Sequence, residues 1–102
     1  MGQMKQYFYG KLSAINYEMA IHEGDANRRL ASQSVKIMLL PKSEVPEKFK
    51  NKYEELMALI ESTLKNMPAP GLIPVRLGGI KNSTASKYLK LLFEIQDEMN
   101  DR

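Results

Sequence analysis

Few side chains in this sequence are of the types that carry out catalysis or bind metal ions. There is one histidine, His22, and there is no cysteine, which excludes cysteine–histidine catalysis and thiolate zinc sites. Glu18 precedes His22 by four residues, so both would share one helix face, but no second pair of this kind occurs to complete a metal site. We therefore predict no catalytic residues, no metal, no cofactor and no enzymatic activity.

A different chemistry is indicated by the basic side chains near the last predicted helix. Residues 62–93 include lysine and arginine but no acid. Backbone amides at a helix N-terminus lack intrahelical partners and attract anions. The predicted anion-binding residues are Arg76, Lys81, Asn82, Ser83, Thr84, Lys87 and Lys90. The alternative is ordinary capping of that helix by Asn82 or Ser83, with the lysines in water.

The stretch 67–81, MPAPGLIPVRLGGIK, is the third candidate site. Six of its fifteen residues are proline or glycine, so neither a helix nor a central strand can continue through it. Most of the others are apolar, which argues against a free polar linker and predicts packing onto the core or onto a partner. The predicted partner-binding residues are Leu72, Ile73, Val75 and Leu77. A loop that only closes one end of the core is the alternative.

Four stretches with helical periodicity must position these residues, and we expect helices at about 4–22, 26–39, 46–66 and 84–99. The clearest is 46–66, where apolar residues recur at steps of three and four. Its stripe consists of Phe49, Tyr53, Leu56, Met57, Ile60, Leu64 and Met67. In the first stretch Gly10 costs about 1 kcal/mol relative to alanine, so a strand pair through Gly10 is the alternative there.

Turn and capping residues predict where these helices begin and end. We expect Gly24 to adopt a left-handed conformation at the end of the first helix and Asp25 to cap the second. Pro41 should end the second helix, since proline disfavours helical geometry at the residue before it. Ser43 is the expected cap of the third helix, with Pro46 in its first turn.

Charged residues predict how the two longest helices are oriented. The third helix begins with lysines and the last ends with acids, which is unfavourable against each helix dipole. An antiparallel arrangement would bring the two groups together and offset the conflict. The groups are Lys48, Lys50 and Lys52, and Glu94, Asp97, Glu98 and Asp101.

Composition leads to the overall prediction, a single all-α domain of 102 residues resembling a four-helix bundle. With no cysteine, no leader-like segment and no apolar run of membrane length, we expect a cytoplasmic protein without membrane contact. The predicted function is a small protein-interaction module that binds a partner, or itself as a homodimer, through 67–81 and the wide apolar face of the last helix. The alternative is nucleic-acid or phosphate-ligand binding through 62–93, which the modest net charge of +3 favours less.

Overall fold

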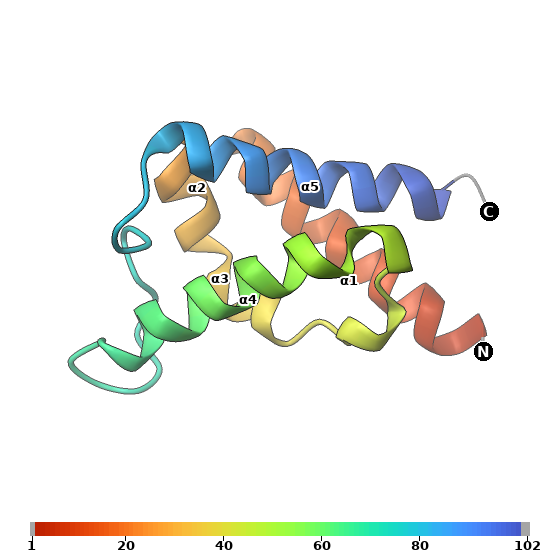
Figure 1. Cartoon of the computed structure of the whole chain (residues 1–102), viewed down its shortest axis with the longest axis horizontal. Coiled ribbons are helices and arrows are strands. Elements are labelled where there is room, and N and C mark those ends of the chain that lie inside the picture. Colours follow the sequence, from red (N-terminus) through yellow and green to blue (C-terminus); the bar gives the residue numbers. More distant parts are fainter. Residues whose placement is uncertain (1, 101–102) are drawn as a thin grey trace.

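The computed structural model describes residues 2–100, with side chains from residue 5 onward. Within that range the chain contains helices and turns but no strand, which confirms the all-α class. The α-helices are α1 (Gly2–Ile21), α2 (Ala26–Ser32), α3 (Ser34–Met38), α4 (Lys50–Lys65) and α5 (Asn82–Asn100), and the 3₁₀ helices are η1 (Lys42–Glu44) and η2 (Glu47–Phe49). In Figure 1 the long helices α1, α4 and α5 run along the molecule, whereas α2 and α3 run across it.

Helix α1 is continuous through Gly10, so the strand-pair alternative is wrong. Its buried apolar side chains recur at steps of four, three and four, as a helix with one inward face requires. They are Phe8, Leu12, Ile15 and Met19. Gly10 lies on the exposed face of the helix, where an added Cβ would meet no other atom within 4 Å.

The predicted helix 26–39 is divided in two, which corrects the expectation of one continuous element. Gln33 separates α2 from α3 with φ −108° and ψ 7°, and its amide bonds Leu30 O at 3.2 Å. On either side, Ser32 Oγ donates to Arg29 O at 2.7 Å and Ser34 Oγ donates to Ala31 O at 2.8 Å. Serine hydroxyls that donate to nearby carbonyls compete with the regular backbone hydrogen bonds of a helix. Two such serines flank this break.

The third predicted helix also begins differently from the expectation. Pro46 precedes the short η2, and α4 starts only at Lys50. No side chain caps either element, so Ser43 is not the cap that we expected. Three residues of the predicted stripe, Tyr53, Leu56 and Ile60, are buried. The other four, Phe49, Met57, Leu64 and Met67, are half-buried.

Helices α4 and α5 are antiparallel, as the charge pattern predicts (Figure 1). The start of the α4 region meets the end of α5 through an ion pair between Lys48 Nζ and Glu98 Oε1 at 2.9 Å. Near the other end, the amide of Gly78 donates to Thr63 Oγ1 at 3.3 Å. An ion pair at the surface, such as Lys48–Glu98, contributes at most about 1 kcal/mol to stability. We therefore use it to assign the orientation of the helices and not to explain their stability. Asp101, the fourth acid of the predicted group, lies outside the described residues.

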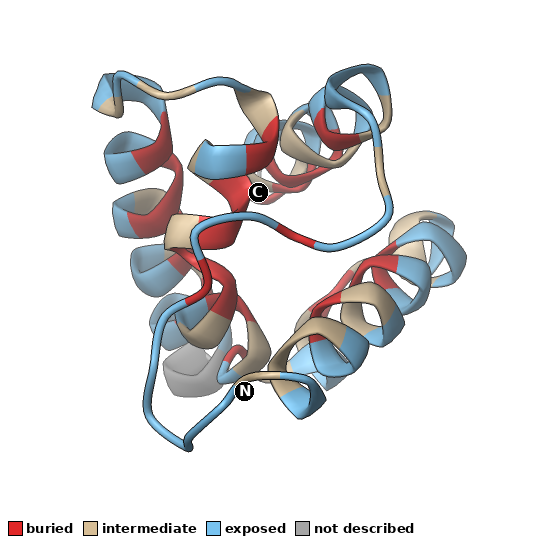
Figure 2. Cartoon of the chain, turned by 90° about the vertical axis from the view of Figure 1, so that its left-hand side faces the viewer, coloured by how far each residue is buried: buried red, intermediate tan, exposed pale blue. Residues whose placement is uncertain are grey.

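The core lies where the inward faces of the helices meet, and the buried residues in Figure 2 follow those faces. Most of the wide apolar face of α5 is used there: Ala85, Leu91, Leu92, Ile95 and Met99 are buried. Tyr88 and Leu89 are half-buried, and Phe93 is exposed. No helix within residues 2–100 combines the length and the apolar character needed to cross a membrane.

Tyr53 is a buried residue whose hydroxyl has no hydrogen-bond partner among the described residues. Burial raises its pKa above the ordinary value of 10.0. The Tyr53 phenol therefore ionises less readily in the folded state than in the unfolded chain. Its contribution to stability is complete below about pH 10. The contribution decreases as pH rises further, because the unfolded chain then releases the proton and the folded chain does not.

We therefore predict that Tyr53→Phe leaves stability at pH 7 unchanged or raises it by up to about 1 kcal/mol, since only an unpaired polar atom is removed. The variant should also lose less stability than the wild type between pH 7 and about pH 11. Urea denaturation at the two pH values measures both effects. A loss of more than about 1 kcal/mol at pH 7 would show instead that the hydroxyl is bonded.

Candidate functional site

The connection between α4 and α5 is held by the side chain of Asn27, the second residue of α2. Its Nδ2 donates to Leu77 O at 3.0 Å and to Ile80 O at 3.3 Å. Its Oδ1 accepts from the amide of Leu77 at 2.6 Å. Buried backbone groups in an irregular segment need hydrogen-bond partners from elsewhere, and here one amide side chain supplies three bonds. We call this contact the Asn27 clamp.

Next to the Asn27 clamp, polar side chains link the first turn of α2 to the first turn of α5. Asn82 Oδ1 accepts from the amide of Asn27 at 3.0 Å, and Asp25 Oδ1 accepts from the amide of Arg28 at 2.9 Å. Asp25 therefore caps α2, as predicted. Its other oxygen, Oδ2, accepts from Arg76 at 3.1 Å and from Asn82 Nδ2 at 3.4 Å. The amide of Arg28 chiefly, and then the guanidinium of Arg76, hold the pKa of Asp25 below its usual value.

Gly24 does not adopt the left-handed conformation that we expected. A glycine fits here because a larger residue would collide with neighbouring side chains. The positive φ angles among described residues belong to Gly71 and Gly79. A Cβ at position 24 would lie 2.8 Å from His22 Cε1 and 2.9 Å from the Cβ of Arg28. His22 Nδ1 accepts from the amide of Gly24 at 2.9 Å, so this histidine shapes the turn between α1 and α2.

The four predicted partner-binding residues fall into two groups. Leu77 is 1% exposed and belongs to the core, so it cannot contact a partner in this fold, which corrects its assignment. Leu72, Ile73 and Val75 are 45%, 60% and 68% exposed. We call these three residues the apolar tip. The connection thus contains both a core-closing part and an exposed apolar part.

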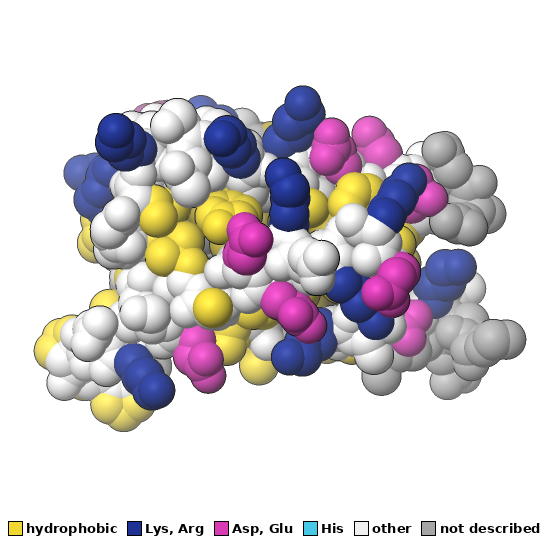
Figure 3. All heavy atoms as spheres, viewed as in Figure 1, with side chains coloured by type: hydrophobic (Ala, Val, Ile, Leu, Met, Phe, Trp, Pro, Cys, Tyr) yellow, Lys and Arg dark blue, Asp and Glu magenta, His cyan; other side chains and the backbone are white. Residues whose placement is uncertain are grey.

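The predicted anion-binding residues are only partly free for a ligand. Arg76 is paired with Asp25, and the side chain of Asn82 bonds Asp25 and the first turn of α2. Helix α5 begins at Asn82 itself, and no bond from the Asn82 side chain to the amides of α5 is present among the described contacts. The others lie on the first half of α5 or just before it: Ser83 and the lysines Lys81, Lys87 and Lys90 are exposed, and Thr84 is half-buried. In Figure 3 basic side chains lie along the left-hand part of α5 and acidic ones along its right-hand part.

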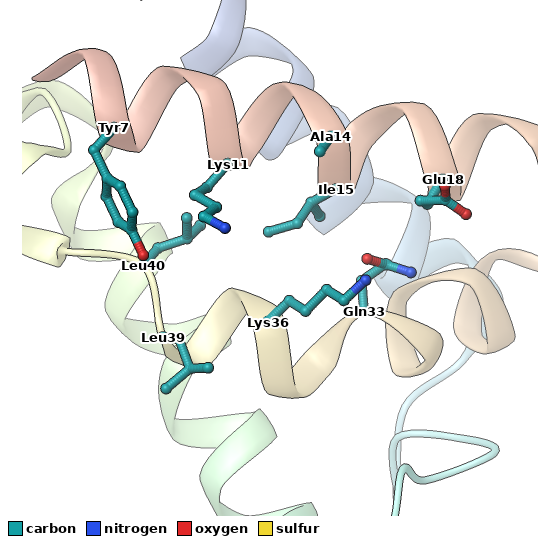
Figure 4. A pocket seen from close by; sticks show the side chains of 9 residues that line it. All are labelled: Tyr7, Lys11, Ala14, Ile15, Glu18, Gln33, Lys36, Leu39 and Leu40. Carbon is teal, nitrogen blue, oxygen red and sulfur yellow. The ribbon is translucent and has the colours of Figure 1, made fainter.

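Sequence patterns gave no indication of a pocket between α1 and α3, shown in Figure 4. Its volume is about 270 Å³. Ile15 and Leu40 form apolar walls, and Lys11 and Lys36 reach it from the two helices. Gln33, at the break between α2 and α3, also lines it. The break between α2 and α3 was not predicted from the sequence. The position of the Gln33 side chain at the pocket was therefore not predicted either.

Within the part of the chain that the structure describes, no three His, Asp or Glu side chains are grouped as metal ligands would be. No protein-family model, curated protein or solved structure matches the chain. The functional assignments below therefore rest on the geometry of these sites.

We predict that Asn27→Asp destabilises the fold by about 1–3 kcal/mol. The substitution keeps the shape and the acceptor for the amide of Leu77, but it replaces the Nδ2 donor with an oxygen facing Leu77 O and Ile80 O. Asn51→Asp, on the exposed face of α4, is the matched control and should change stability by less than about 0.5 kcal/mol. Equal urea midpoints for the two variants would contradict the clamp.

Proposed function

We propose that this protein is a small non-enzymatic interaction module that binds an apolar surface, on a protein partner or on a second copy of itself, through the apolar tip. The observation that carries the proposal is the contrast within one segment. Leu72, Ile73 and Val75 are exposed, while Leu77, two residues after Val75, is buried and clamped at both its amide and its carbonyl.

This contrast matters because the fold does not need the tip to be apolar. Exposed polar side chains at these three positions would leave the Asn27 clamp and the Arg76–Asp25 ion pair unchanged. Apolar residues that gather at the surface are typical of binding sites. A segment that is already held in place also loses less conformational entropy on binding than a free loop does.

A second apolar area lies close to α5 and supports the same function. Figure 3 shows apolar side chains between α4 and α5, with charged side chains of both signs around them. Tyr88 and Leu89 of α5 are only half-buried. An apolar strip with charged residues around it has the composition of an interface with a polar rim. We place the module in the cytoplasm, because without cysteine the chain lacks the disulfide framework that is common in small secreted domains.

The tip can be tested separately from the core. The double substitution Ile73→Ser/Val75→Ser should change the free energy of unfolding by less than about 0.5 kcal/mol and weaken association at least roughly fivefold. Leu77→Ser should instead cost about 2–5 kcal/mol, because it creates a cavity and buries a hydroxyl. Ile21→Ser is the matched control, since Ile21 is 56% exposed on α1 and lies outside the connection.

Sedimentation equilibrium over a range of concentrations measures self-association, and a photo-crosslinking residue at position 73, compared with one at position 21, detects a partner. The proposal predicts association that depends on the tip in one of these assays. A monomer that crosslinks equally from both positions contradicts it. The alternative, nucleic-acid binding through Lys81, Lys87 and Lys90, would be favoured if a DNA duplex shifted the amides of residues 81–90 in a salt-dependent manner.

A further inference from the structure

We propose that the pocket between α1 and α3 binds a small organic anion that has an apolar body and a hydroxyl or N–H donor. The proposal does not depend on the apolar tip, because the pocket and the tip share no residues. Three features carry it: an unpaired buried acceptor, a pair of lysines and an apolar wall.

The acceptor is Oε1 of Gln33, which is buried without a hydrogen-bond partner among the described residues. The residue is only 7% exposed, and it is held at the break between α2 and α3, where its carbonyl accepts from the amide of Ile37 at 2.9 Å. Figure 4 shows its side-chain oxygen on the pocket side. Leaving such an acceptor unpaired costs free energy, and a ligand that donates to it would recover that cost.

Charge in the pocket favours an anion. Lys11 comes from α1 and Lys36 from α3, so the two amino groups approach from opposite walls. Among the described residues that line the pocket, Glu18 is the only acid. Lys11 Nζ lies 5.6 Å from the centre of the Tyr7 ring, which helps to hold this lysine at the pocket edge. Two lysines against one glutamate leave an excess positive charge for a carboxylate or a similar group.

The remaining walls and the size define the rest of the ligand. Ile15 and Leu40 are buried apolar residues at the pocket, and Leu39 adds an exposed apolar edge. A volume of about 270 Å³ lies just below the range of roughly 300–1,000 Å³ that is common for ligand pockets, so the ligand should be small. An aliphatic acid with one hydroxyl group satisfies the acceptor, the lysines and the apolar wall together.

The test uses three probes that differ by one group: 2-hydroxy-4-methylpentanoate, 4-methylpentanoate without the hydroxyl, and neutral 2-hydroxy-4-methylpentanamide. Each is titrated into the ¹⁵N-labelled full chain up to about 20 mM, since a ligand of this size binds in the millimolar range. We expect saturable amide shifts around residues 11–15 and 33–40. The hydroxy acid should bind roughly tenfold more tightly than the acid without the hydroxyl, and more tightly than the amide.

Two variants assign the contacts. Gln33→Met should fold at least as well as the wild type, since it removes an unpaired acceptor, and it should abolish the preference for the hydroxyl. Lys36→Met should weaken both acids roughly tenfold without changing the affinity for the amide. Lys52→Met, an exposed lysine of α4 outside the pocket, is the control and should bind all three probes as the wild type does.

The wild-type probe series decides the matter even if a variant does not fold. Equal affinity for the two acids would overturn the role of Gln33, and equal affinity for the hydroxy acid and its amide would overturn the role of the lysines. Shifts spread over every lysine-bearing surface, or none at the highest concentration, would overturn the site as a whole.

Discussion

The structure of the connection depends on one amide side chain, that of Asn27, bonded to the backbone of Leu77 and Ile80. Prolines and glycines prevent residues 67–81 from forming their own regular hydrogen bonds, so the partners have to come from elsewhere in the fold. With those partners supplied, Leu77 can enter the core and α5 can start in a fixed place beside α2. The clamp thus converts a long irregular segment into an ordered part of the molecule.

Around the clamp, charges that are distant in sequence become neighbours. Residues 62–93 contain no acid, yet Asp25 lies against Arg76 and Asn82 in the fold. The negative charge sits where the first turns of α2 and α5 meet, and it offsets the positive ends of both helix dipoles. The basic surface that remains is the row of lysines along α5. This explains why we favour apolar contacts over anion binding at the connection.

Local patterns predicted the elements but not the contacts between distant parts of the chain. Stripes of apolar residues identified α1, α4 and α5, and the end charges gave the antiparallel order that the Lys48–Glu98 pair confirms. The break at Gln33 was missed because serine hydroxyls can bond backbone in several ways, and tertiary packing selects one. Asn27 was missed as a clamp because its partners lie fifty residues away, beyond any local pattern. Leu77 and Val75 are both apolar residues of the same irregular segment, so the sequence does not indicate which is buried. The fold shows that Leu77 is buried and Val75 is exposed.

The most direct test of the account is hydrogen exchange at the amide of Leu77. In the structure this amide donates to Asn27 Oδ1 at 2.6 Å and lies in the core, so its exchange should require an opening that costs nearly the full free energy of unfolding. The amide of Ile73, at the exposed tip, should exchange much faster than the amide of Leu77. If the two amides exchange at similar fast rates, the connection is not clamped, and the apolar tip is not held in place.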